Sequence, residues 1–155
     1  MAKLWFDSSS HMENYYIGRH IDIVNNWLLN VKPPKSISRR PRKISERRFW
    51  KANEWRSWLL YFALPCLDEL LAQPYLEHFS ILVESLHILL NKKISRDELE
   101  LVDSYLTEFV SRFQTLYGIA AMTFNVHLLT HLTKSVQMWG PLWTHSAFVF
   151  LAMEI

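Results

Sequence analysis

One amphipathic segment in the second half of the chain constrains the fold more than any other feature. Ser95 and Glu98 have the spacing of a capping box, which satisfies free backbone N–H groups where a helix begins. Gly118 is suited to the position just after a helix ends. Apolar residues recur between them with a helical period: Leu99, Val102, Leu106, Phe109, Val110, Phe113 and Tyr117. The pattern predicts a helix of about 20 residues that buries this stripe against other elements.

Further helical patterns cover most of the chain. We predict helices over residues 19–30, 45–64, 74–90 and 124–139, and a short helical piece over residues 68–72. Ser45 is the predicted N-cap of the second of these helices, and Pro65 is predicted to end or kink it. In the first, Ile23, Trp27 and Val31 are expected to share the buried side. Glycine occurs only three times, so the predicted fold is all-α: a single helical domain of about five to six helices.

Two regions differ in composition. Residues 1–44 are predicted to form an N-terminal segment with a short helix and a basic, proline-containing loop, and residues 45–155 the main helical domain. Half of the 155 residues are hydrophobic and 14% are aromatic, which indicates a dense core or a surface that partners cover. The rings of the 45–64 helix are interpreted as core, with base stacking as the alternative.

The cysteine count and the hydropathy indicate a compartment. The single cysteine excludes an internal disulfide and fits a reducing environment. No apolar run reaches the roughly 18 residues of a membrane helix, and the beginning of the chain lacks the layout of a signal peptide. We therefore expect a nuclear or cytoplasmic protein that is not secreted and has no membrane partner.

Positive charge is concentrated in residues 32–51, here called the basic segment. It holds nine cationic residues and one acid, a local charge of +8 in a chain whose total is +2. Cations on a loop stiffened by proline suit phosphate contacts, which do not depend on base sequence. The predicted nucleic-acid contacts are Arg39, Arg40, Arg42, Lys43, Arg47 and Arg48. The alternatives are a solvated linker and a nuclear-import-like tract.

Two histidines share one side of the predicted 124–139 helix. His127 and His131 are four residues apart and lie opposite the apolar stripe of Val126, Leu129, Leu132, Val136 and Trp139. This spacing allows two imidazoles to hold one zinc ion, although a structural site needs about four ligands. His145 or Cys66 would have to supply more. The alternative is a pair of solvated or interface histidines without metal, and we expect no other cofactor.

Several segments together resemble one family. They include Thr-Phe-Asn-Val-His-Leu-Leu-Thr-His-Leu at residues 123–132 and Gly-Pro-Leu-Trp-Thr-His-Ser-Ala-Phe at residues 140–148. Others are residues 3–7, 50–65, 75–79 and 116–118, in matching order over nearly the whole chain. The chain thus resembles the helical domain of unknown function that follows the catalytic core of CACTA-type cut-and-paste DNA transposases.

The resemblance implies a role beside a nuclease. Such transposases resemble RNase H-fold enzymes, in which two aspartates and a glutamate hold two Mg²⁺ ions, and the helical domain is an insertion before the glutamate. The His-x-x-x-His pair resembles half of the zinc site of the related V(D)J recombinase, which makes His127 and His131 the implied ligands.

The carboxylates that the resemblance requires are not found in register. The family's glutamate directly follows the Ser-Ala-Phe-x-Phe motif, where this chain has Leu151, and Glu154 is displaced by three residues. The family's aspartate lies before the Leu-Trp-Phe motif, which here is residues 4–6. We therefore expect no enzyme activity and predict a non-catalytic, transposon-derived helical domain that binds DNA through the basic segment. The alternatives are a protein-interaction or oligomerisation module, and a transposase fragment that is active only when other segments complete it.

Overall fold

The structure is a computed structural model that describes residues 1–35, 37 and 40–144. Within these residues every regular element is helical and no strand occurs, which confirms the predicted all-α class. None of the helices in the described ranges has both the length and the apolar character needed to cross a membrane. The chain divides into two compact units, Met1–Leu76 and Glu77–Ile155. This division falls inside a helix, whereas the predicted boundary follows residue 44.

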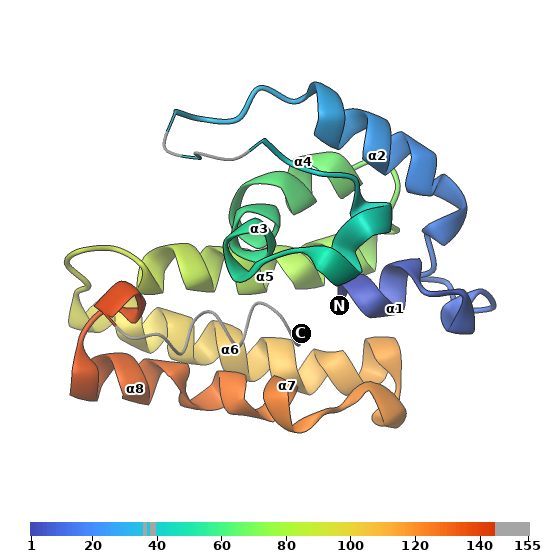
Figure 1. Ribbon diagram of the computed structural model, residues 1–155. Coiled ribbons are helices and arrows are strands. Elements are labelled where there is room, and N and C mark those ends of the chain that lie inside the picture. The colour runs from blue at the N-terminus through green and yellow to red at the C-terminus, as the bar shows by residue number, and fades with distance from the viewer. Residues whose placement is uncertain (36, 38–39, 145–155) are drawn as a thin grey trace. The chain divides into compact units, whose positions relative to one another are not determined.

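The N-terminal unit is made of short helices. Its α-helices are α1 (Ala2–Phe6), α2 (Ile21–Asn30), α3 (Ala52–Ser57) and α4 (Ala63–Leu67), and it contains the first residues of α5 (Gln73–Leu89) (Figure 1). Single turns of 3-10 helix lie between them at Ser8–Ser10 and Gly18–His20, and a longer 3-10 segment covers Ile44–Phe49. The bond from the Ser45 backbone N–H to Asn25 Oδ1, at 3.2 Å, joins this segment to α2.

The predicted helix over residues 45–64 is wrong in its first part. Residues Ile44–Phe49 form a 3-10 segment, Trp50 and Lys51 are extended, and α3 begins only at Ala52. The Glu54 carboxylate accepts the Lys51 backbone N–H at 2.8 Å, so Glu54 and not Ser45 caps the helix start. A π-helical turn, Trp58–Phe62, then separates α3 from α4. Pro65 lies in α4 and has no N–H for the carbonyl four residues earlier, which favours such a local change of winding.

Two further expectations for this unit are corrected. In α2 the buried residues are Val24, Asn25 and Leu28, while Ile23 is exposed. Residues 68–70 form a turn and not a helical piece.

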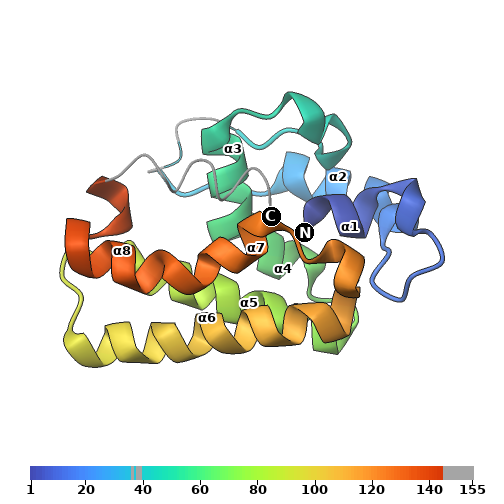
Figure 2. The same cartoon turned by 90° about the horizontal axis from the view of Figure 1, so that it is seen from below.

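The C-terminal unit is built on long helices. α6 (Arg96–Tyr117) runs antiparallel to the part of α5 in this unit and to a final stretch of α7 (Phe124–Leu128), 3-10 turn Leu129–His131 and α8 (Leu132–Trp139) (Figure 1). α6 and α8 lie side by side in both views (Figure 2). Thr133 Oγ1 donates to Asp103 Oδ1 at 2.5 Å between these two helices. The predicted 124–139 helix is therefore present but changes its winding in the middle.

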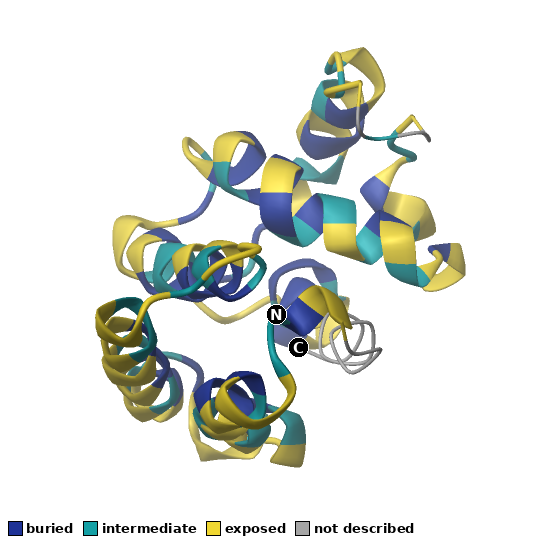
Figure 3. Ribbon diagram, turned by 90° about the vertical axis from the view of Figure 1, so that its left-hand side faces the viewer, coloured by how far each residue is buried: buried dark blue, intermediate teal, exposed yellow. Residues whose placement is uncertain are grey.

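Capping and periodicity explain the length of α6. The Ser95 side chain accepts the Glu98 backbone N–H, and Glu98 Oε2 accepts the Ser95 N–H at 2.7 Å, which confirms the capping box. Gly118 has φ of 81°, a left-handed conformation that glycine adopts without strain. Buried and exposed residues fall on different sides of the helices (Figure 3), and Val102, Leu106, Phe109, Phe113 and Tyr117 form the buried side of α6.

His78 of α5 belongs to this core and is fully buried. Its ring stacks on Phe109 at 4.1 Å between centroids, and its Nε2 lies 2.8 Å from the Phe109 carbonyl oxygen. Burial lowers the pKa of His78 to about 4. His78 therefore lies inside the core, whereas His87 of the same helix is exposed.

Candidate nucleic-acid interface

The basic segment presents a set of exposed cations. In its described part, six side chains of this kind are exposed: Lys32, Lys35, Arg40, Lys43, Arg48 and Lys51. Arg48 lies over the ring of Phe49, with its guanidinium carbon 4.6 Å from the ring centroid. Phe49 is itself exposed, so this cation–π contact lies at the surface.

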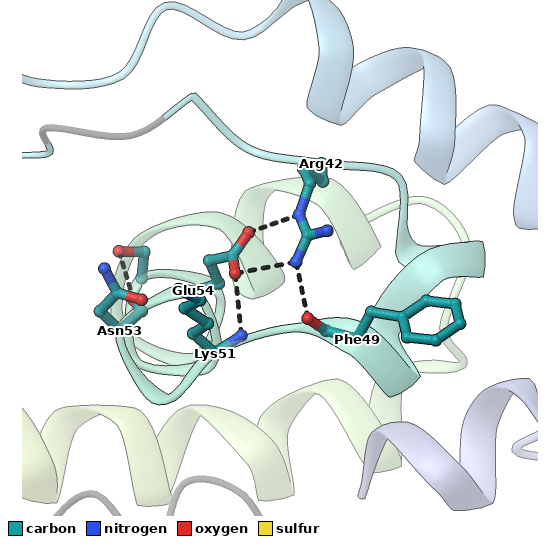
Figure 4. A network of polar contacts seen from close by, with 6 residues as sticks. Arg42, Phe49, Lys51, Asn53 and Glu54 are labelled. Carbon is teal, nitrogen blue, oxygen red and sulfur yellow. Dashed lines mark hydrogen bonds and ion pairs between the residues drawn. The ribbon is translucent and has the colours of Figure 1, made fainter.

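Arg42 has a structural partner inside the N-terminal unit. Its Nε donates to Glu54 Oε1 at 2.7 Å, and its Nη2 donates to Glu54 Oε2 at 2.9 Å and to the Phe49 carbonyl at 2.8 Å (Figure 4). Hydrogen bonding to Glu54 raises the pKa of Arg42. The Glu54 side chain is only 7% exposed, so this ion pair balances a buried carboxylate and fixes the basic segment to the start of α3.

Arg47 is engaged in the same way with α1. Its guanidinium forms an ion pair with Asp7 and lies over the Phe6 ring, 5.7 Å from the centroid. The Arg47 side chain is 19% exposed. Like Arg42, Arg47 forms an ion pair within the N-terminal unit, so its positive charge is partly balanced by a carboxylate.

The six predicted contacts therefore fall into three groups. Arg40, Lys43 and Arg48 are exposed. Arg42 and Arg47 are paired with carboxylates, and Arg39 lies outside the described residues. The local charge count does not separate these groups, because the partners Asp7 and Glu54 lie outside the basic segment in sequence.

A pocket of about 280 Å³ adjoins the exposed cations within the N-terminal unit. Its exposed lining residues are Arg40, Asn53, Arg56 and Tyr61, and its buried ones are Leu28, Trp50, Glu54, Trp58 and Phe62. Trp50 packs edge-on against Trp58, at 6.0 Å between centroids. Of the rings interpreted as core, Trp50, Trp58 and Phe62 are buried, whereas Phe49 and Tyr61 are exposed.

The predicted zinc ligands lie together on the C-terminal unit. His127 and His131 are both exposed, with ring centroids 5.3 Å apart and planes at 87°. The described residues contain no group of three or more histidine, cysteine or acidic side chains that could hold a metal. Burial raises the pKa of the Cys66 thiol to about 12, which disfavours the thiolate that a metal needs. His145 lies outside the described residues, and the zinc half-site stays a prediction.

Comparison of the chain with protein-family models, with curated proteins and with solved structures finds no match.

Proposed function

We propose that this protein is a nucleic-acid-binding module whose basic segment contacts backbone phosphates. The observation that carries the proposal is the set of six exposed cations between Lys32 and Lys51. The same segment contains one acidic residue, the exposed Glu46. Phosphate contacts from such side chains supply affinity without reading base sequence.

The two internal ion pairs support the same proposal. Arg42 and Arg47 attach the basic segment to Glu54 and Asp7. An attached segment loses less conformational entropy on binding than a free linker does, so its exposed cations are partly preorganised. The attachment of the basic segment favours a binding surface over a solvated tail.

The order of the sequence motifs supports a transposase origin. In this proposal the chain is a non-catalytic helical domain whose relatives accompany a nuclease core. The cations it uses for binding are its own, so binding should not require divalent metal ions or a catalytic carboxylate.

A salt titration with duplex DNA tests the proposal. If the six exposed cations contact phosphates, the logarithm of the binding constant should fall with the logarithm of salt concentration, with a slope of about −5. Fluorescence anisotropy with two duplexes of unrelated sequence should give equal affinities. An affinity that does not change with salt, or no binding at low salt, would rule the proposal out.

A second candidate function is protein interaction through the C-terminal unit. Met138, Trp139 and Trp143 are 65%, 70% and 56% exposed, and large apolar side chains so close in sequence are costly to leave in water. The prediction that Trp139 lies on the buried stripe is therefore wrong. Sedimentation velocity tests self-association: a concentration-dependent shift that is lost in Trp139→Ser supports it, and an unchanging monomer contradicts it.

A further inference from the structure

We propose that the pocket beside the basic segment takes one unpaired base of a bound nucleic acid. The inference rests on the proposed function and adds its ligand class: strands with an unstacked base, in preference to fully paired duplex. It follows from the size of the pocket, from the side chains that line it, and from the cations next to it.

The size of the pocket suits one ring system. Its volume of about 280 Å³ lies just below the range of roughly 300–1,000 Å³ that is usual for sites of drug-sized ligands. A single base is a flat group that such a space can enclose, while a base pair needs a longer one.

The walls of the pocket offer stacking surfaces. Tyr61 lines the pocket and is 44% exposed, so part of its side chain is accessible there. Arg40 contributes a second planar group from the basic segment. Aromatic rings and guanidinium planes are the groups on which proteins stack unpaired bases.

The pocket also has a group that can pair with a base edge. Asn53 is exposed and lines the pocket. Its backbone carbonyl accepts the Ser57 hydroxyl at 2.9 Å, and its side-chain amide has no partner among the described residues. An amide presents both a donor and an acceptor, which is the pattern that base edges require.

A cation at the pocket can bind the phosphate backbone of the strand whose base enters it. Arg40 belongs to both the pocket and the set of exposed cations. A phosphate held by Arg40 would leave the attached base beside the pocket, which Arg40 and Tyr61 both line. Unstacking a base costs a few kcal/mol in a duplex and little in a single strand, so the pocket should favour strands in which a base is already free.

Anisotropy titrations of the full chain test the inference with three probes at one salt concentration. The probes are a short duplex, the same duplex with one internal unpaired base, and the single strand. We expect the second and third probes to bind about tenfold tighter than the first. Tyr61→Ala should remove this preference and leave duplex affinity unchanged. The matched control is Phe124→Ala, which removes an exposed ring of the C-terminal unit. This variant should retain the preference for an unpaired base.

Asn53→Ala provides a second variant at an exposed position, where folding is not at risk. It should lower the preference for an unpaired base about threefold and leave duplex binding intact. Photo-crosslinking of the single strand, mapped by mass spectrometry, should identify Tyr61. Equal affinity for all three probes, with no effect of either variant, would overturn the inference and leave the proposed function standing. Absence of binding to every probe would overturn both.

Discussion

The two units of this protein reach their folds by different means. In the C-terminal unit, α6 has a clear apolar stripe, a capping box and a terminal glycine. Its charged pair Arg96–Glu100 is largely exposed, and both carboxylates of Arg96–Glu100 and Arg112–Glu108 are at least half exposed. In the N-terminal unit the helices are short and irregularly wound, and Arg42 and Arg47 hold segments together through carboxylates. Arginine–carboxylate pairs therefore differ in role between the units. Those of α6 lie on one helix surface, whereas those of the N-terminal unit join segments that are distant in sequence.

Loss of a ring from the α6 stripe should have the largest effect. Phe109 is fully buried and stacks on His78, so Phe109→Ala should lower the free energy of unfolding by about 4 kcal/mol. Urea denaturation followed by circular dichroism measures the change. Ile119→Ala, at a residue that is 76% exposed, is the control and should change it by less than about 0.5 kcal/mol.

Acid should weaken the C-terminal core through His78. Because its pKa is about 4 in the folded state and 6.5 in the reference state, its neutral form favours folding fully above pH 6.5. This contribution is lost as the pH falls from 6.5 to 4, by up to about 3 kcal/mol. Nearby Arg112 and Glu108 act in opposite directions on this pKa, and burial is the larger cause.

Denaturation midpoints measured across this pH range test the assignment. The loss between pH 6.5 and 4 should disappear in His78→Leu and persist in His87→Gln, which alters an exposed histidine of the same helix. A wild-type stability that is constant from pH 7 to pH 5 would contradict it.

Removal of the Glu54 charge should affect the N-terminal unit specifically. In Glu54→Gln the guanidinium of Arg42 loses its charged acceptor, and we expect a loss of about 2 kcal/mol. Hydrogen exchange should show reduced protection in α3 and unchanged protection in α6. Glu100→Gln, whose side chain is 65% exposed in its ion pair, should change stability by less than about 0.5 kcal/mol. Equal effects from both variants would remove the contrast between the units.

The capping box should contribute the smallest of these effects. Ser95→Ala removes the side chain that accepts the Glu98 N–H and should cost about 1 kcal/mol. Thr123 occupies the same position before α7 but makes no capping bond, so Thr123→Ala should be nearly neutral. Thermal melts of the two variants compare them directly.

Sequence periodicity predicted the C-terminal unit well and the N-terminal unit poorly. The α6 stripe and its caps are local signals, and the structure confirms them. At the break, Glu54 accepts the Lys51 N–H three residues away and also pairs with Arg42 twelve residues away. The second contact is not part of any local pattern. In α2 the predicted buried side through Ile23 is wrong, because packing within the unit buries the side that carries Val24 and Leu28.

The candidate site was predicted only in outline. Charge clustering located the basic segment, but which arginines are exposed depends on Asp7 and Glu54, the former 40 residues from Arg47. The pocket was not predicted, because Arg40, Asn53 and Tyr61 come together only through the irregular path between α2 and α4. The one available signal was the dense run of aromatic residues, which also fits core packing.

The central claim is that exposed cations of the basic segment bind phosphates, and one matched pair of variants tests it most directly. Arg40→Ala/Lys43→Ala/Arg48→Ala and Lys92→Ala/Lys93→Ala/Lys134→Ala each remove three exposed cations, the first from the N-terminal unit and the second from the C-terminal unit. Net charge becomes −1 in both, from +2. The first should reduce the magnitude of the salt slope for duplex binding by about 3, and the second should leave it unchanged. Equal slopes for the two variants would contradict the claim.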